Sequence, residues 1–487
     1  MLTSDDEGCM SSQAPLMDLR NQAELRRIYH KIDRVILPLM FMCYFLEFLD
    51  KILIGYANVM GLERDLDLAP GQFQWLATIL YVGMAVGQLP QAALLQRLPV
   101  SKVLGANVAL WGAMVCGMAG ARGFAGLAAL RALLGALEAV VAPALIMVTT
   151  QWYTKRQAVP RMGLWYSGIG VGQIVGGLVS WAAQHAPAHA SSSSWRIMFG
   201  AAGALNVITG VAVFVFLPTG VEAARFLSER ERRTVREALL ADQAGNGKKV
   251  FRWSGVREAL TDLQVLLFVL FTLATVTPGG FITSFSAVVI RGLGFTPRQA
   301  ALLNMPSGAV TIIGTAASTL AILHDFPRWL GIVLLLIPSM LGAGLMSFAT
   351  SSRAAALTGV YLVNLDIAPL VLVFSMVGAN VQGYTKKVVV TGLVSLANAC
   401  ASIVGPQTFR PGDAPGYVPA KVTVFCVTGV GIVLAVLLRV LYGRRNGRNA
   451  AARRAAMEAI ARGEAEAAEV LNEEETDLKN DKFVYMY

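Results

Sequence analysis

Three ionisable residues, Glu47, Asp50 and Lys51, interrupt an apolar run that begins at Val35. A charge inside a lipid bilayer costs at least about 2.5 kcal/mol on insertion scales, so such residues usually face a bundle interior or a water-filled cavity. On a helix, positions 47, 50, 51 and 54 share one face. The spacing therefore predicts a helix with one polar face that looks into a solvent-accessible pathway.

Two other apolar runs carry buried charges at a similar depth. At 1.5 Å per residue, Glu47 lies roughly 18 Å from the start of its run, Glu138 roughly 17 Å and Asp366 about 18 Å. A bilayer core is about 30 Å thick, so all three carboxyl groups fall near its middle. Arg131, on the same run as Glu138, lies near the outer rim.

Carboxyl groups at this depth suit proton carriage, because burial and neighbouring charges together decide whether they hold a proton. Ammonium and guanidinium groups suit the binding of a substrate carboxylate. The candidate proton-coupling residues are Glu47, Asp50 and Glu138. The candidate substrate-binding residues are Lys51, Arg131, Asp366, Asn364 and Asn380.

A structural interpretation of the same charges stays open. Glu47 and Lys51 have the i,i+4 spacing of an ion pair within one helix. Arg131 and Glu138 could form a structural pair between helices. Neither arrangement requires transport chemistry.

The composition is that of an integral membrane protein. Of the 487 residues, 55% are hydrophobic and only 15% are charged, whereas soluble domains are near 25% charged. The mean hydropathy is +0.56. Nine uncharged windows and three that carry charges are long enough for membrane helices of about 20 residues. The twelve predicted spans are 35–56, 68–96, 103–121, 127–151, 162–195, 197–221, 263–290, 299–323, 329–352, 355–378, 388–409 and 422–438.

The net charge of +10 reflects topology rather than nucleic-acid binding. If the N-terminus is cytoplasmic, 31 of the 41 Lys and Arg residues fall in inside segments. This bias follows the positive-inside rule and predicts that both termini are cytoplasmic. The predicted cytoplasmic segments are the N-terminal tail 1–34, the central loop 218–262 and the C-terminal tail 442–487. We expect this last tail to begin as a helix and to end as a solvated, disordered segment.

Two short motifs recur at nearly equal offsets. Leu66-x-Leu-x-Pro-x-Gln72 resembles Leu293-x-Phe-x-Pro-x-Gln299, and Gln151-x-Tyr-Thr-Lys-Arg156 resembles Gln382-x-Tyr-Thr-Lys-Lys387. The offsets are 227 and 231, and each pair falls at an equivalent place in the topology. The repeat predicts two six-helix bundles, 35–217 and 263–441, with a site between them at mid-membrane.

Other function classes find little support. The sequence has no hydrolase triad, Walker loop or metal-ligand set, and its charges lack a nucleophile–base arrangement. We therefore predict no enzymatic activity, no cofactor, no metal and no nucleic-acid partner.

The assembled motifs resemble the fungal allantoate permease family, in the anion:cation symporter branch of the major facilitator superfamily. The resemblance runs in order across roughly 35–440. The matching stretches include Arg131-x-x-x-Gly135-x-x-Glu138, and the most family-specific ones are Asn380-Val-x-Gly383-x-Thr-Lys-Lys387 and Ile403-Val-Gly-Pro-Gln-Thr-Phe409.

The resemblance implies an all-α membrane protein of twelve transmembrane helices with the major facilitator fold. It implies alternating access and uptake of small organic anions, commonly with protons, through a cavity lined by helices 1, 4, 7 and 10. We expect a monomer in the plasma membrane. Lys51 stands where members of the family more often have Arg, so the resemblance does not identify allantoate as the substrate of this protein. An exporter of a fungal metabolite and a nutrient sensor that signals without flux remain alternatives.

Overall fold

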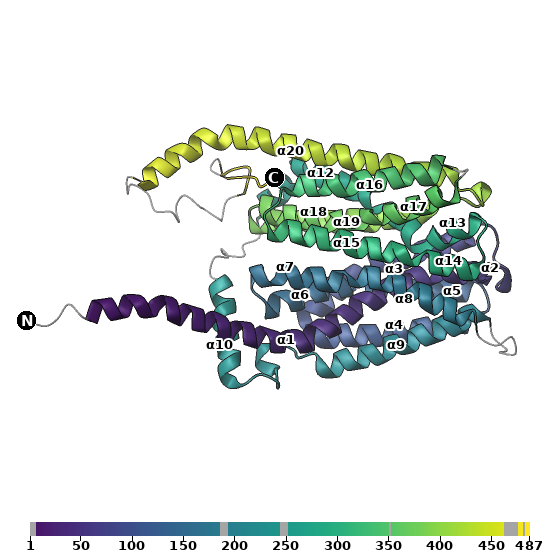
Figure 1. Cartoon of the computed structure of the whole chain (residues 1–487), viewed down its shortest axis with the longest axis horizontal. Coiled ribbons are helices and arrows are strands. Elements are labelled where there is room, and N and C mark those ends of the chain that lie inside the picture. Colours follow the sequence, from purple (N-terminus) through teal and green to yellow (C-terminus); the bar gives the residue numbers. More distant parts are fainter. Residues whose placement is uncertain (1–5, 186–192, 244–251, 350–351, 462–475, 481–482) are drawn as a thin grey trace, which may run out of the picture.

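The computed structural model describes residues 6–185, 193–243, 252–349, 352–461, 476–480 and 483–487. Figure 1 shows two helical bundles lying side by side, with the chain passing once from the first to the second. The end of the molecule from which the N-terminal helix projects also holds the last residues of the chain. We call it the terminal end, and the other the distal end.

The N-terminal bundle contains the first six long membrane-crossing paths. Its elements are α1 (Asp6–Val59), α2 (Leu62–Asp65), α3 (Gln72–Arg97), α4 (Val100–Ala119), α5 (Phe124–Glu138), α6 (Val141–Trp152), α7 (Lys155–Tyr166), α8 (Gly168–Ala183) and α9 (Ser194–Phe216).

The C-terminal bundle repeats this plan. Its elements are α12 (Leu263–Val276), η2 (Phe281–Phe285), α13 (Ser286–Gly292), α14 (Pro297–Leu303), α15 (Met305–Leu323), α16 (Arg328–Phe348), α17 (Arg353–Val363), η3 (Asn364–Ile367), α18 (Pro369–Asn380), α19 (Tyr384–Gln407), η4 (Pro411–Asp413) and α20 (Val418–Ala461).

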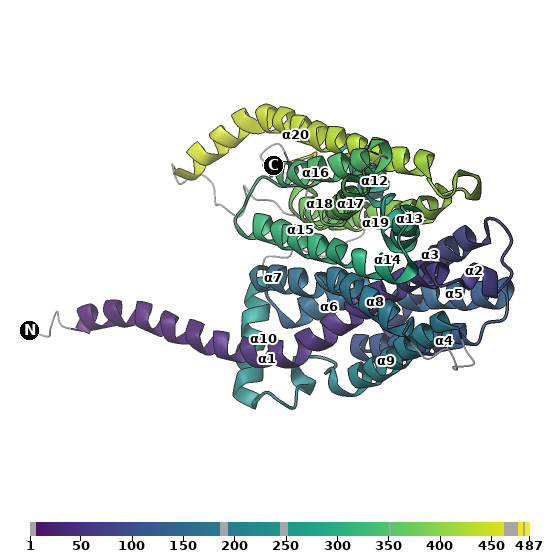
Figure 2. The same cartoon turned by 45° about the vertical axis from the view of Figure 1, so that its right-hand side comes forward.

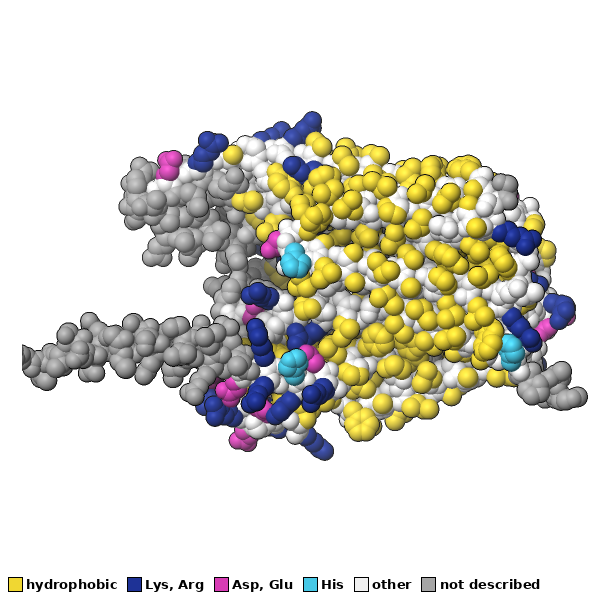
Figure 3. Space-filling model, in the orientation of Figure 1, with side chains coloured by type: hydrophobic (Ala, Val, Ile, Leu, Met, Phe, Trp, Pro, Cys, Tyr) yellow, Lys and Arg dark blue, Asp and Glu magenta, His cyan; other side chains and the backbone are white. Residues whose placement is uncertain are grey.

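The all-α prediction is confirmed, and the spans agree with it. Among the described residues, eleven helical stretches are long and apolar enough to cross a membrane. The twelfth predicted span, 35–56, lies within α1, and its three ionisable residues keep it from meeting the same apolar criterion. Figure 3 shows a broad hydrophobic band across the face of the molecule in view, with most of the visible Lys and Arg gathered at the terminal end.

Several of the crossing paths are broken near their middle. Proline removes a backbone donor and clashes with the carbonyl four residues earlier. The break between α5 and α6 lies at Ala139, four residues before Pro143, and η3 contains Leu365, four residues before Pro369. These breaks place Glu138 at a helix end and Asp366 in a 3₁₀ turn. Irregular backbone at membrane depth is tolerated where protein or a cavity surrounds it.

The part of the predicted N-terminal tail next to the membrane, residues 23–34, is continuous with the first span, because α1 runs without interruption to Val59. Its apolar residues Ile28, Tyr29 and Ile32 are buried in the N-terminal bundle. Tyr29 packs against Tyr153, with ring centroids 5.9 Å apart. The apolar face of this segment therefore contacts protein.

The segment between the bundles contains η1 (Val221–Ala223), α10 (Glu229–Gln243) and α11 (Trp253–Thr261). The spacing of Ser228 and Glu231 produces the capping box typical of a helix start. The Ser228 amide donates to Glu231 Oε2 at 2.9 Å, and the Glu231 amide donates to Ser228 Oγ at 3.3 Å.

One of the two repeated motifs forms the same hydrogen bond in each bundle. The Ala69 amide donates to Gln72 Oε1 at 2.9 Å, and the Thr296 amide donates to Gln299 Oε1 at 3.0 Å. In both bundles the repeated glutamine accepts from the amide three residues before it at the start of a helix, and Gln299 also completes a capping box with Thr296. The equal geometry supports the two-fold plan deduced from the motifs.

The bundles meet closely where α8 crosses α15. A Cβ atom added to Gly170 would lie 2.4 Å from the Gly308 carbonyl oxygen, and one added to Gly308 would lie 2.3 Å from the Gly170 oxygen. Small residues allow backbones to approach in this way. Figure 2 shows α8 beside α14 and α15 from a second direction. Glycine at this crossing sets the distance between the bundles.

Candidate functional site

The polar face of α1 divides into two. Successive helical residues are separated by about 100°, so Asp50 and Lys51 point in directions about 100° apart. Glu47 and Lys51 face α5, whereas Asp50 faces α4 and α9. The sequence grouped these three residues on one face, and the packed bundle separates them.

Lys51 lies between two carboxylates. Its Nζ forms an ion pair with Glu47 on the same helix and lies 3.6 Å from Oε2 of Glu138 on α5. The side chain of Glu138 is fully buried, and those of Lys51 and Glu47 are 11% and 8% exposed. Because one ammonium serves both carboxylates, the two glutamates lie at one level. The i,i+4 pair exists, and it is part of a three-residue cluster.

The side chain of Arg131 is buried and only 1% exposed. It shares the buried face of α5 with Glu138, and its Nε donates to the Leu76 carbonyl at 3.1 Å. Among the described residues its Nη1 has no hydrogen-bond partner. Burying such a donor is costly, so this edge of the guanidinium is available for an incoming acceptor. The ion pair of Glu138 is with Lys51, on another helix.

Asp50 joins three helices of the N-terminal bundle. Its Oδ2 accepts hydrogen bonds from Trp111 Nε1 at 2.8 Å and from Asn206 Nδ2 at 2.5 Å. Trp111 is on α4 and Asn206 on α9, and all three side chains are buried. The carboxylate is therefore held away from Lys51, behind the face that carries the cluster.

Asp366 has a similar position in the C-terminal bundle. Its Oδ2 accepts a hydrogen bond from Thr428 Oγ1 on α20 at 3.0 Å, and it is only 3% exposed. Neither this carboxyl group nor those of the N-terminal bundle faces the outer apolar surface. Asp366 points toward α20, whereas Asn364, two residues earlier, points toward the other bundle.

Asn364 takes part in a polar contact between the bundles. Its Oδ1 accepts from Gln173 Nε2 on α8 at 3.0 Å, and Gln173 Oε1 accepts from Thr311 on α15 at 3.5 Å. Gln173 is fully buried. The sequence analysis did not single out Gln173, although a lone glutamine in an uncharged membrane helix was a usable signal.

Tyr81 was also missed by the sequence analysis. Its hydroxyl lies 3.2 Å from Thr283 Oγ1, which joins α3 to the irregular turn η2. Nearby, Thr78 accepts from Gln407 Nε2 at 2.7 Å, and Phe73 packs on Phe285 at 5.4 Å. Single aromatic and hydroxyl residues in apolar runs give no pattern that could have predicted these contacts.

Asn380 lies at the end of α18, and the structure does not bring it to the cluster. It ends α18 at the terminal end, where its side chain pairs with the backbone of Met486. The residues in the cluster instead come from the membrane-crossing part of α1 and from the last residue of α5. Among the described residues, no three His, Cys, Asp or Glu side chains are arranged to hold a metal.

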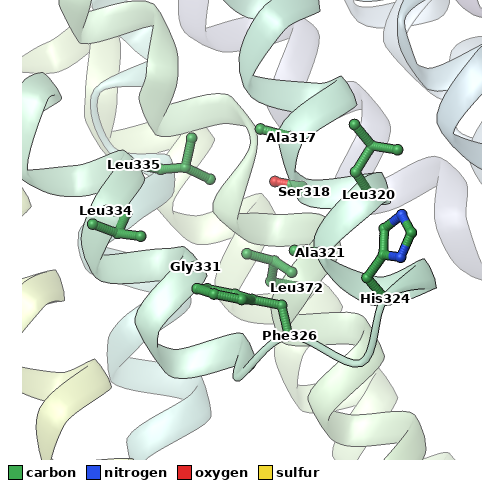
Figure 4. Close-up of a pocket in the computed structure, with 10 residues that line it drawn as sticks. All are labelled: Ala317, Ser318, Leu320, Ala321, His324, Phe326, Gly331, Leu334, Leu335 and Leu372. Atoms are coloured by element: carbon green, nitrogen blue, oxygen red, sulfur yellow. The ribbon is translucent and has the colours of Figure 1, made fainter.

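A separate cavity of about 340 Å³ lies between α15, α16 and α18. Figure 4 shows its side chains, which are apolar apart from Ser318 and His324. Leu320 and Leu334 at its edge are more than half exposed on the outer surface of the bundle. Its chemistry suits hydrocarbon, so it is not the site for a charged solute.

Comparison with known proteins identifies the family. The model of the Major Facilitator Superfamily matches residues 40–406. The allantoate permease of Saccharomyces cerevisiae is 30% identical over 87% of this chain and 80% of its own length. A thiamine pathway transporter of the same yeast is 31% identical over 86% of this chain and 80% of its own. An uncharacterised transporter of Schizosaccharomyces pombe is 34% identical over 87% and 81%.

Solved structures agree on the fold. A bacterial homologue of the lysosomal transporter Spinster has a TM-score of 0.62 at 18% identity and covers 83% of this chain and 95% of its own. A D-xylose–proton symporter has a TM-score of 0.62 at 13% identity, covering 83% and 96%. The membership also confirms the expectation of a transporter rather than an enzyme. This chain is a multi-pass integral membrane protein that belongs to the Major Facilitator Superfamily and has the yeast allantoate permease among its relatives.

Proposed function

We propose that the protein is a secondary active transporter that moves a small organic anion of the carboxylate type together with a proton, by alternating access. The observation that carries this proposal is the cluster in which Lys51 serves both Glu47 and Glu138. The similarity to an allantoate permease points to the same substrate class.

Charge balance links anion binding to proton binding in this cluster. With both glutamates ionised, the three side chains carry a net charge of −1. A substrate carboxylate that engages Lys51 would add another negative charge in a buried site, where unpaired charge is costly. Uptake of one proton by a glutamate removes that cost. We assign the proton to Glu138, which is the more deeply buried and has only the longer contact to Lys51.

The remaining groups fit supporting roles in this proposal. The free edge of Arg131 would complete the hold on the substrate carboxylate, and Asn364 would contribute a neutral polar contact from the other bundle. Asp50 and Asp366 would position α1 and the centre of the broken path α17–α18, through their hydrogen bonds to neighbouring helices.

Orientation and location belong to the proposal as well. Lys and Arg concentrate at the terminal end, which supports cytoplasmic termini by the positive-inside rule. We propose a plasma-membrane carrier that works as a monomer, with substrate, protons and lipid as its partners.

Purified protein in liposomes provides the test. An imposed pH gradient, acidic outside, should drive accumulation of at least one labelled carboxylate, with allantoate as the first probe followed by other small mono- and dicarboxylates. A protonophore should abolish the accumulation. Accumulation of only neutral or cationic solutes, or accumulation that ignores the pH gradient, would contradict the proposal.

A further inference from the structure

The last residues of the chain are docked on the protein. Thr476–Asn480 and Phe483–Tyr487, which we call the C-terminal segment, lie against the terminal end of the C-terminal bundle, beside α12, α16 and α20 (Figures 1 and 2). Asp477 and Tyr485 are 1% and 2% exposed. The expectation of a solvated tail is therefore wrong for these residues, whereas residues 462–475 lie outside the described part of the chain.

A buried charge network anchors one end of this segment. Lys386 Nζ lies 2.8 Å from Asp477 Oδ1, 2.8 Å from Asp262 Oδ2 and 2.9 Å from Glu258 Oε1. The side chains of Lys386, Asp262 and Asp477 are completely buried. Arg445 on α20 adds an ion pair to Asp262 at 2.5 Å. The network joins α11, α12, α19 and α20 to one another, and Asp477 ties the C-terminal segment to it.

The two aspartates differ in how firmly they hold their charge. Burial raises the pKa of Asp477 above its ordinary value, and Lys386 only partly opposes this. In Asp262, burial also raises the pKa, but the hydrogen bond from Arg445 and the charge of Lys386 outweigh it and lower the pKa. Asp262 and Glu258 would therefore still neutralise Lys386 if the C-terminal segment left.

The other end of the segment is bound through its backbone. Asn446 Nδ2 donates to the Tyr485 carbonyl at 2.9 Å, and the Tyr485 amide donates to Asn446 Oδ1 at 2.8 Å. Asn380 makes the same two-way contact with Met486, at 2.9 Å and 2.6 Å. Such paired contacts fix both the position and the direction of a peptide.

Aromatic contacts fill the space between these polar groups. Tyr485 stacks on the buried Tyr442 with ring centroids 5.4 Å apart, and its hydroxyl donates to Asp477 Oδ2 at 3.0 Å. The Arg439 guanidinium lies 3.8 Å from the centre of the Tyr487 ring. The Arg328 amide, at the start of α16, donates to the Tyr487 carbonyl at 2.8 Å. The segment therefore also reaches α16.

The turn before α19 is shaped to receive the segment. Gly383 has φ = 87°, which favours glycine, and a Cβ atom there would lie 3.0 Å from Thr476 Cγ2. The neighbouring Gln382 amide donates to Asp477 Oδ1 at 3.3 Å. A side chain at position 383 would both strain the turn and press on the C-terminal segment.

We propose that this surface is a peptide-binding site and that its occupant is the chain's own C-terminal segment. The docked segment acts as a staple that holds the terminal ends of α12, α16, α18, α19 and α20 together as one rigid body. The transport cycle requires this rigid body. Every partner that the described residues give the segment belongs to the C-terminal bundle or to α11, which precedes it. The segment thus braces one bundle and leaves the other free to move against it. This inference does not depend on the substrate.

Removal of residues 476–487 tests the staple directly. Because Lys386 keeps Asp262 and Glu258, the shortened protein should still fold, with a melting temperature lower by roughly 5 °C or more. The initial transport rate, or uptake of a labelled substrate in cells, should fall about tenfold. A fluorescent synthetic peptide of residues 473–487 should bind the shortened protein, restore its melting temperature, and not bind the full-length protein, in which the site is occupied.

Single substitutions in the full-length chain provide the second arm. Tyr485→Ala and Asn446→Ala should reproduce most of the loss of melting temperature and transport rate. Both should also expose the backbone amides of positions 485 and 486 to hydrogen exchange. Val484→Ala and Leu478→Ala are matched controls, since these side chains are 48% and 44% exposed, and should change neither property. Equal melting temperatures and rates with and without the segment, peptide binding by neither protein, or equal losses in the controls would overturn the proposal.

Discussion

The two bundles repeat one plan, but they distribute charge differently at mid-depth. In the N-terminal bundle, Lys51 joins Glu47 and Glu138 in a buried ionic cluster, with Arg131 on the same face of α5. In the C-terminal bundle, the corresponding depth holds Asn364, which is neutral, and Asp366, which points toward α20. Repetition of the fold has therefore not kept the charges symmetric, and ionic chemistry is concentrated on one side of the interface.

The bundles also resemble each other in one respect. Asp50 and Asp366 each lie behind the face that meets the other bundle, and each accepts hydrogen bonds from a peripheral helix. Asp50 accepts from Trp111 and Asn206 on two helices, and Asp366 accepts from the hydroxyl groups of Thr428 and Ser339. A carboxylate in this position ties a central helix to its support. The comparison thus separates charges that face the interface from charges that hold helices in place.

The largest expected effect comes from removing the shared cation. Lys51→Gln leaves two buried carboxylates without an ion partner, and breaking a buried charge pair costs about 2–5 kcal/mol in binding. Uptake of the carboxylate substrate should fall at least about 30-fold. Lys51→Arg keeps the charge and should retain measurable uptake. Initial rates would be divided by the amount of folded carrier in the membrane, so that poor expression is not mistaken for lost function.

A substitution in the other bundle provides the contrast to Lys51→Gln. Asp366→Asn should lower uptake by less than about tenfold, since Thr428 retains an acceptor. If this variant lost uptake as completely as Lys51→Gln, the ionic chemistry would not be confined to the N-terminal bundle and the comparison would fail.

Glu138→Gln should separate proton coupling from substrate binding. The amide keeps the size of the side chain but cannot carry the proton assigned to it. Accumulation driven by a pH gradient should fall about tenfold, while exchange of labelled for unlabelled substrate continues at zero gradient. Exchange and gradient-driven uptake are measured in the same liposomes. Glu237→Gln, on the exposed surface of α10, is a charge-matched control. Normal acidification-driven accumulation by Glu138→Gln would place the proton elsewhere.

The two supporting aspartates should differ in their effect on stability. Asp50→Ala leaves the N–H groups of Trp111 and Asn206 buried without an acceptor, at about 1–3 kcal/mol for each orphaned group. Asp366→Ala leaves the hydroxyl groups of Thr428 and Ser339, which can turn to backbone carbonyls. Asp50→Ala should therefore lower the melting temperature more than Asp366→Ala in detergent. The reverse order would show that the hydrogen bonds of Asp50 do not hold its bundle together.

The smallest effect concerns the exposed surface of the N-terminal bundle, where Lys31 contacts Glu231. The hydrogen bond from Lys31, with that from the Ser228 amide, lowers the pKa of Glu231 below its ordinary value. A lowered carboxyl pKa gives stability that is present at neutral pH and is lost as pH falls through the folded-state value. Half of the Lys31 side chain is exposed, so this contribution is at most about 1 kcal/mol.

Glu231→Gln measures that contribution cleanly. Glutamine can still cap the start of α10, so only the charge is removed. The difference in melting temperature between this variant and the unchanged protein should be small at pH 7 and should vanish once the pH falls below the lowered pKa of Glu231. A difference that persists in acid would show that the side chain acts through packing rather than charge.

Membrane class, span number and the repeat could all be predicted from the residues. Long uncharged windows have one stable solution in a bilayer, which is a helix with every backbone group paired. The repeated Gln72 and Gln299 accept the same backbone hydrogen bond at the start of their helices, as their spacing suggests. The candidate residues Glu47, Lys51 and Glu138 were also found in this way, because a charge in an apolar run is conspicuous.

The direction in which a side chain points, and the distant residue that it contacts, could not be predicted in the same way. Periodicity placed Asp50 with Lys51, but only the packing of α4 and α9 shows that it turns away. The contacts of Gln173 with Asn364 and of Asn380 with Met486 join residues 191 and 106 positions apart. Local pattern carries no information about which distant segment will come to lie beside a given side chain.

The sequence by itself determined that this chain forms apolar helices in two repeated sets, because the cost of unpaired backbone and of charge in lipid is set by local composition. Only the tertiary structure decided that one lysine serves two glutamates and that the last ten or so residues return to close one bundle, because both depend on helices from separate parts of the chain meeting at particular angles.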